Sequence, residues 1–198
     1  MQRAQPFAAV WGLRIWGMQQ RTPTFSFSAA AGGKTKTEQL QNTILRGFME
    51  RTLIIVKPEG VQRGLIGNVL TRLEQRGLKF VGLKLLQITP ELAEQHYGVH
   101  KGKPFYNGLV KHITSGPVVV GVVEGPKAIS VVRTTMGATN AAEAIPGTIR
   151  GDYALDIGYN IIHGSDGPET AVQEINLFFK PEELLSYSLV TDQWVFEQ

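Results

Sequence analysis

The sequence predicts an α/β (α+β) fold, a ferredoxin-like βαββαβ sandwich with an antiparallel four-stranded sheet. Short apolar runs of strand length alternate with segments whose apolar residues recur at helical spacing. This alternation starts abruptly at Met49, and no internal repeat accompanies it. At 42% hydrophobic and 19% charged residues, the composition is that of an ordinary globular protein. We therefore expect one domain over residues 49–198.

The first half of the domain predicts a strand, a helix and a second strand. Residues 52–56 form an apolar strand that stops at Lys57-Pro58. Apolar residues at helical spacing follow, and Gly77 is a typical residue for the end of that helix. Residues 80–87 give the second strand.

The second half supplies the remaining elements. The predicted elements are helices over 90–97 and 104–113, a strand over 117–123, a helix over 128–136, a strand over 160–162 and a helix over 168–179. Residues 137–150 have no regular period, and a loop of that length in a compact domain is usually functional or disordered. Arg133 and Arg150 flank it, so a phosphate clamp of two guanidiniums is one interpretation and two solvated surface arginines the other.

Residues 1–48 differ from the rest and are predicted to be an unstructured N-terminal extension. They are rich in Arg, Ser and Thr, with Glu38 as their single acid, which is typical of an organellar transit peptide. Alternatively, translation starts at Met49, and the preceding Leu45-Arg46-Gly47-Phe48 is a translated ribosome-binding site. The first interpretation predicts a mitochondrial or plastid location, and the second a cytoplasmic one, which we take as the expectation.

Composition excludes several classes of function. Cysteine is absent, which excludes disulfides, thiolate nucleophiles and Cys-based zinc sites. The apolar runs are too short to span a bilayer, so no membrane partner is expected. Residues 1–48 carry six Lys and Arg against one acid, whereas residues 49–198 carry 14 against 16. Because the domain itself is slightly acidic, a nucleic-acid partner is not expected.

The stretch Asn160 to Thr170 places a histidine between a strand and a helix. The predicted strand ends at Ile162, and Asp166 is the predicted N-cap, with Pro168 and Glu169 in the first turn. His163 would then lie on the link, near the positive end of a helix, where a group that meets an anion is well placed. On this stretch alone, a structural or hydrogen-bonded surface role is the alternative to a chemical one. The other histidines lack a metal-ligand spacing with carboxylates. His96 and His100 are an i, i+4 pair that could in principle bind a metal, but we expect them to lie at a partly exposed helix end.

Several motifs together resemble the nucleoside diphosphate kinase family, from Met49 to about Val195. The motifs are KPEGVQRG from Lys57, HY from His96, KPF from Lys103, SGPVV from Ser115, PGTIRGD from Pro146 and NIIHGSD from Asn160. The resemblance implies reversible transfer of the γ-phosphoryl group, mainly from ATP, to nucleoside diphosphates. It implies a ping-pong route through phosphorylated His163, with Ser165 and Glu174 holding the imidazole. An imidazole with an ordinary pKa near 6.5 is a competent nucleophile at cellular pH.

The resemblance also implies the binding residues, the cofactor and the assembly. The implied nucleotide contacts are Lys57, Tyr97, Arg133, Thr139 and Arg150 on the phosphates, Lys57 and Asn160 on the ribose, and Phe105 with Ile157 on the base. Mg²⁺ is implied on the nucleotide phosphates, with Asp166 reaching it through water. A homo-oligomer is implied, either a tetramer or a hexamer.

One departure from the family pattern concerns the site region. Glu59 stands where the family usually has Asp, which we expect to alter a local turn contact and leave the chemistry unchanged.

Two competing functions are a nucleic-acid-binding or regulatory module that has lost catalysis, and a different His-dependent phosphotransferase or hydrolase. Transfer of phosphate to GDP, as opposed to water, separates the last of these from the family activity.

Overall fold

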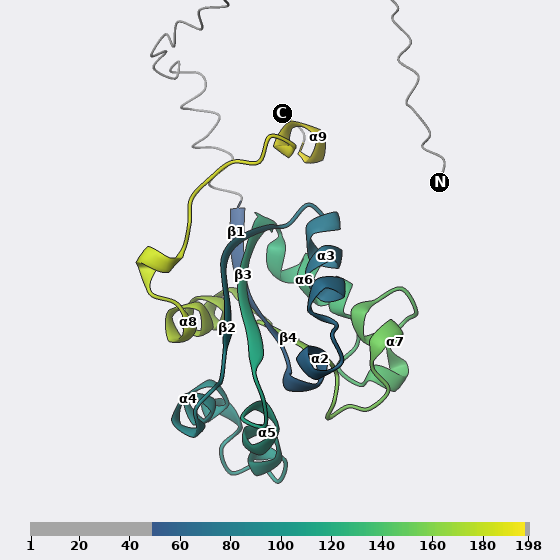
Figure 1. The fold of residues 1–198 in the computed structure, drawn as a ribbon, viewed down its shortest axis with the longest axis vertical. Helices are drawn as coiled ribbons and strands as arrows, with labels where there is room; N and C mark the ends of the chain where they lie inside the picture. The colour runs from purple at the N-terminus through teal and green to yellow at the C-terminus, as the bar shows by residue number, and fades with distance from the viewer. Residues whose placement is uncertain (1–48, 197–198) are drawn as a thin grey trace, which may run out of the picture. The chain divides into compact units, whose positions relative to one another are not determined.

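The computed structural model describes residues 49–196, so the predictions for residues 1–48 lie outside the described residues (Figure 1). Four strands form one sheet in the order β2-β3-β1-β4, and each neighbouring pair is antiparallel. The strands are β1 (Met49–Val56), β2 (Lys79–Leu86), β3 (Val118–Pro126) and β4 (Ile162–Gly164). This topology confirms the predicted ferredoxin-like fold.

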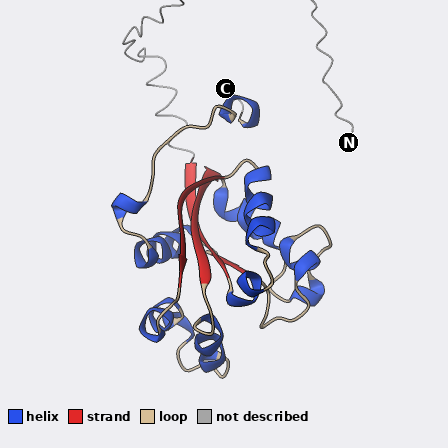
Figure 2. Cartoon of the chain, in the orientation of Figure 1, coloured by secondary structure: helices blue, strands red, loops and turns tan. Residues whose placement is uncertain are grey.

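Both faces of the sheet are covered by helices (Figures 1 and 2). One face carries α4 (Pro90–His96), α5 (Tyr106–Ile113) and α8 (Pro168–Phe178), and the other carries α3 (Ile66–Gln75), α6 (Ala128–Met136) and α7 (Ile149–Tyr153). Successive strand residues point to opposite faces, so Leu53 and Ile55 of β1 join the first core and Ile54 and Val56 the second. The short helix α2 (Pro58–Gln62) follows β1 directly.

Shorter elements complete the described chain. They are the 3₁₀ turns η1 (Gly98–His100), η2 (Ala141–Glu143) and η3 (Pro181–Glu183), and the C-terminal helix α9 (Asp192–Val195). In the described part of the chain, no helix has both the length and the apolar character to cross a bilayer.

The last strand begins two residues later than predicted. Ile161 has φ of +70°, a left-handed conformation that a strand does not contain, so β4 starts only at Ile162. His163 therefore lies within β4, opposite Ile55 of β1, and the prediction that placed it on the link was wrong. The predicted cap was wrong as well, because Gly167 is the N-cap of α8 and no side chain caps that helix.

Helices α2, α7 and α9 were not predicted. Pro58 stops β1 as expected, but it also opens α2, where its fixed φ suits the first turn. Residues 137–150 are not without structure, because they contain η2 and the start of α7. The Thr148 side chain caps α7 by accepting a hydrogen bond from the Gly151 N–H at 3.1 Å.

Candidate active site

His163, Ser165 and Glu174 form one hydrogen-bonded group. Nε2 of His163 lies 2.9 Å from Oε1 of Glu174, while the Ser165 hydroxyl donates to Oε2 of the same carboxylate at 2.5 Å. Strand β4 and the residue after it position His163 and Ser165, and helix α8 supplies Glu174 on its buried face. The Leu53 N–H of β1 donates to the Ser165 hydroxyl at 3.3 Å, which ties the group to the central strand.

Glu174 is held ionised in spite of its burial. Burial raises the pKa of a carboxyl, but the hydrogen bonds from His163 and Ser165 and the nearby histidine charges bring the pKa of Glu174 below its usual value. An ionised carboxylate only accepts hydrogen bonds, so His163 carries its proton on Nε2. Nδ1 then keeps its lone pair, and no hydrogen bond among the described residues engages it. Such an imidazole can act as a nucleophile through Nδ1.

Lys57, Asn160 and Thr139 are joined by hydrogen bonds. The Lys57 ammonium donates to Oδ1 of Asn160 at 2.7 Å, and the Asn160 amide donates to the Thr139 carbonyl at 3.0 Å. Lys57 is 7% exposed, and burial lowers its pKa to about 8, although Glu59 opposes the shift and Arg150 adds to it. A buried ammonium of this kind favours a nearby anion.

Arg133 and Arg150 are neighbours, and their clamp on a phosphate stays a prediction. Burial lowers the pKa of Arg150 to about 10, and the neighbouring Arg133 guanidinium contributes to the shift. Arg150 is 4% exposed and donates to the carbonyls of Gly137, Asn160 and Ile162 at 2.8–3.3 Å. Three of its five N–H groups are thus engaged, which leaves two for a ligand. Arg133 is exposed and approaches the Gly164 carbonyl at 3.5 Å.

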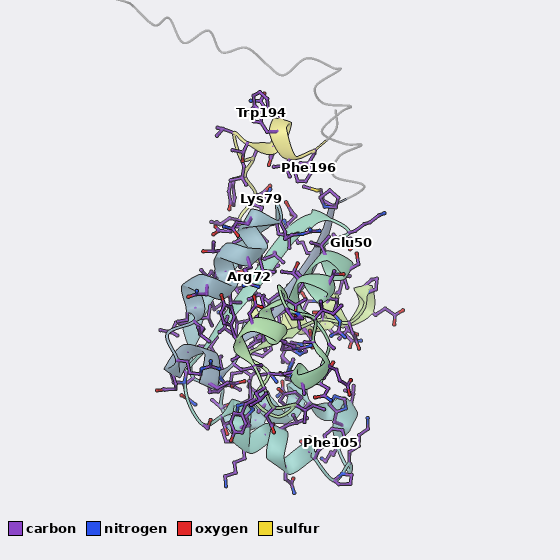
Figure 3. The ribbon with its side chains drawn as sticks, turned by 90° about the vertical axis from the view of Figure 1, so that its right-hand side faces the viewer. Glu50, Arg72, Lys79, Phe105, Trp194 and Phe196 are labelled. Carbon is purple, nitrogen blue, oxygen red and sulfur yellow. The ribbon has the colours of Figure 1, made fainter. Side chains whose placement is uncertain are left out.

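The remaining predicted residues differ in their exposure. Tyr97 is buried at the end of α4, and its ring is 4.6 Å from that of His96. Phe105 is 53% exposed and lies beside α5 in Figure 3, with the His100 ring 5.6 Å away. Ile157 is 59% exposed. Asp166 is exposed on the turn between β4 and α8.

His96 was misjudged from the sequence. It is not at a partly exposed helix end, because its side chain is only 1% exposed and its ring lies 4.8 Å from that of His163. Burial is the main reason why its pKa falls to about 4, and the neighbouring His163 lowers it further. The signal available in the sequence was its place three residues after Ala93, on the apolar face of α4.

Glu59 and His112 are further residues whose place was not predicted. Oε1 of Glu59 accepts the Ile161 N–H at 2.8 Å, and Oε2 lies 2.8 Å from Nε2 of His112 on α5. The prediction that Glu59 makes a local turn contact was wrong, because its partners Ile161 and His112 are distant in the chain. Burial raises the pKa of Glu59, but the hydrogen bonds from His112 and the backbone outweigh it and lower the pKa. No sequence period could have paired residues from α2, α5 and the approach to β4.

A family model described as nucleoside diphosphate kinase matches residues 50–184, more than half of the chain. The chain belongs to the nucleoside diphosphate kinase family. It is 66% identical over 147 residues to a protein of Thermomicrobium roseum named nucleoside diphosphate kinase, across 74% of this chain and 99% of that protein. A protein of the same name from Carboxydothermus hydrogenoformans is 62% identical, across 75% of this chain and all of that protein.

A solved structure of the same family gives a similar fold. The halophilic nucleoside diphosphate kinase of Halobacterium salinarum, solved in complex with CDP, has a TM-score of 0.73 and 54% identity, over 75% of this chain and 99% of that chain. The nucleoside diphosphate kinase match contains every predicted site residue, from Lys57 to Glu174. The family acts on nucleotides and generally uses a divalent metal ion.

Proposed function

We propose that this chain is a nucleoside diphosphate kinase that transfers the γ-phosphoryl group of a nucleoside triphosphate, mainly ATP, to nucleoside diphosphates through phosphorylated His163. This reaction maintains the pools of NTPs and dNTPs. One observation carries the proposal: Glu174 binds Nε2 of half-buried His163 and leaves Nδ1 available. The arginines, Lys57 and the family membership support it.

In the first half-reaction, the Nδ1 lone pair attacks the γ-phosphorus of the triphosphate. The bond from that phosphorus to the β,γ-bridging oxygen breaks, the electron pair stays on the leaving diphosphate, and the phosphoryl group remains on His163. The imidazole becomes positively charged, and Glu174 stabilises that charge through Nε2–H. A terminal phosphate oxygen of a second diphosphate then attacks the phosphoryl group and regenerates neutral His163.

Positively charged and polar groups position the phosphates during this transfer. Arg133 and the two remaining N–H groups of Arg150 bind phosphate oxygens, and Lys57, Tyr97 and Thr139 add contacts on the same side. Their work is orientation and charge neutralisation, the main demands of phosphoryl transfer. Ser165 keeps the Glu174 carboxylate oriented.

Asn160 and Lys57 bind the ribose hydroxyls, and Phe105 and Ile157 hold the base between apolar surfaces. Stacking on an aromatic face accepts every base, whereas discrimination requires hydrogen bonds to the base edge. The exposure of Phe105 and Ile157, 53% and 59%, supports a binding surface open to solvent and therefore broad base tolerance.

The divalent metal ion is Mg²⁺, bound mainly by the nucleotide phosphates. Mg²⁺ prefers oxygen ligands and retains several waters, so a single exposed carboxylate such as Asp166 fits an outer contact through water. Bound Mg²⁺ neutralises charge on the β- and γ-phosphates.

The active form is a homo-oligomer, either a tetramer or a hexamer. The edge strand β2 supports this, because Leu83 and Leu85 on it are 52% and 66% exposed. Light scattering after gel filtration measures the subunit number, and a monomer would contradict the proposal.

We place the enzyme in the cytoplasm, and mass spectrometry of the native N-terminus tests this, since a cleaved transit peptide would indicate an organelle.

The central experiment incubates the protein with γ-labelled ATP and then adds GDP. We expect acid-labile label on the protein, transfer of that label to GDP, and no labelling of a His163→Ala variant. Label that passes to water and not to GDP would indicate a hydrolase. Labelling and turnover by His163→Ala would refute the assignment of His163.

A further inference from the structure

His96 is a buried polar side chain without a partner. Neither ring nitrogen has a hydrogen-bond partner in the described structure, although the side chain is only 1% exposed. Buried nitrogens normally have partners, and leaving them unpaired costs free energy. No proposed step of phosphoryl transfer uses this ring, which lies edge-on to His163 at an interplanar angle of 83°.

Three potential metal ligands converge around His96. Oε1 of Glu174 lies 3.6 Å from Nδ1 of His96 and 2.9 Å from Nε2 of His163. Ligand atoms of all three residues lie within 4.8 Å of one another, and they come from α4, β4 and α8. Ser165 fixes the other carboxylate oxygen, as a group behind a metal ligand typically does.

The spacing and the chemistry of these atoms fit zinc. Two imidazoles and one carboxylate are a common zinc ligand set, with a fourth position open to water. Tetrahedral zinc with bonds of about 2.0–2.1 Å separates its ligands by roughly 3.3 Å. The separations of 2.9 and 3.6 Å from Oε1 need shifts of only a few tenths of an ångström, whereas the two imidazole nitrogens, which lie within 4.8 Å of each other, have to move closer together by more than that. The positive charge of the nearby Lys57 opposes the binding of a metal ion, but its ammonium group points toward Asn160, to which it donates a hydrogen bond.

We propose that His96, His163 and Glu174 form an inhibitory zinc site within the kinase. Zn²⁺ takes the lone pair of Nε2 of His163, and the proton displaced from that atom moves to Nδ1. Nδ1–H has no lone pair with which to attack a phosphoryl group, so the zinc-bound form is not phosphorylated. His96 binds through Nδ1 and keeps its proton on Nε2. Mg²⁺ does not compete, because it prefers oxygen ligands.

The test measures Zn²⁺ binding to the full-length dephosphorylated protein by titration calorimetry, without nucleotide. We expect one Zn²⁺ per chain, Kd raised at least about 10-fold in His96→Phe, and an unchanged Kd in His100→Phe, a control on the next turn. The site shares two residues with the proposed function, but binding without nucleotide is independent of turnover. If the protein showed no transfer of labelled phosphate, the measured Zn²⁺ affinities would still test the zinc site.

A second measurement does not depend on the folding of a variant. In nitrogen-15 NMR spectra of the wild-type imidazoles, Zn²⁺ should shift both His96 and His163 and move the His163 proton to Nδ1. Equal Zn²⁺ affinity in wild type and a folded His96→Phe would overturn the proposal, and so would spectra in which His96 does not respond. In the kinase assay at constant Mg²⁺, Zn²⁺ should reduce phosphorylation of His163 in proportion to occupancy.

Discussion

The carboxylate of Glu59 holds the backbone of Ile161, two residues before His163. Oε1 of Glu59 accepts the Ile161 N–H at 2.8 Å, and the Lys57 N–H donates to the Ile161 carbonyl at 2.8 Å. Both backbone polar groups of Ile161 are therefore fixed by the segment after β1. This matters because a β-branched residue with φ of +70° is strained and persists only where its surroundings hold it.

Replacing Glu59 by Ala should destabilise the fold and slow the phosphorylation of His163. The change leaves the buried Ile161 N–H and His112 without a partner, at a cost of about 2 kcal/mol in the free energy of unfolding. Urea unfolding measures the stability, and labelling by γ-labelled ATP measures the rate. Glu94→Ala, at an exposed position on α4, should change neither. Wild-type stability in Glu59→Ala would show that the strained Ile161 does not depend on Glu59.

The same contacts predict a loss of stability in acid. The pKa of Glu59 is lower in the folded protein than the ordinary value of 4.5, so the folded state favours the ionised form. Its contribution to stability is complete above about pH 4.5 and is lost as the pH falls through the folded pKa. Glu59→Gln should therefore lose less stability than wild type between about pH 5 and pH 3. Parallel pH profiles for the two proteins would contradict this.

Lys57 should set the alkaline limb of the pH profile of kcat/KM. Burial lowers the pKa of Lys57 to about 8, so the free enzyme loses this positive charge as the pH rises through that value. Because kcat/KM reports groups of the free enzyme, it should fall above about pH 8 in wild type. Lys57→Arg stays charged and should move the fall to higher pH, even if its maximum rate is lower. An unmoved alkaline limb in Lys57→Arg would assign it to another group.

The fold could be predicted, and His163 could be singled out as a candidate, because their signals are local. Apolar runs mark β1 and β3, helical spacing marks α3, and NIIHGSD identifies His163. The order of elements then limits the topology, since adjacent segments pair with few alternatives. The predicted bounds of β4 were wrong because Ile161 has a left-handed backbone conformation, which residue propensities do not predict.

The supporting contacts of the site could not be predicted because they join distant segments. Glu59 meets Ile161 across 102 positions, and His96 meets His163 only once α4 packs beside α8. Burial also changes what a residue does: Arg150 was predicted as a phosphate ligand, and its three carbonyl contacts became visible only in the fold. The roles of Phe105 and Ile157 stay predictions.

The two arginines should separate into one that stabilises the fold and one that acts on the substrate. Arg150→Ala removes three hydrogen bonds to carbonyls, two of them buried, and should lower the free energy of unfolding by about 2 kcal/mol or more. It should also weaken phosphate binding. Arg133→Ala changes an exposed side chain and should alter stability by less than about 0.5 kcal/mol while raising KM for the diphosphate. Thermal unfolding and steady-state kinetics distinguish them, and equal stability losses would contradict the assignment.

Glu174→Gln should test whether the carboxylate sets the tautomer of His163. The amide of Gln can donate to Nε2, which would then accept and leave the proton on Nδ1, the wrong nitrogen for attack. Loss of the correct tautomer costs as much as about 10⁴-fold in the serine proteases, so we expect a fall on the order of 100-fold or more in the rate of phosphorylation. Nucleotide affinity should hardly change, because Glu174 lies behind the imidazole and donates nothing to the phosphates. Glu174→Asp keeps the charge and should recover part of the rate if its shorter side chain still reaches Nε2. A rate near that of wild type in Glu174→Gln would mean that some other group selects the nitrogen that attacks.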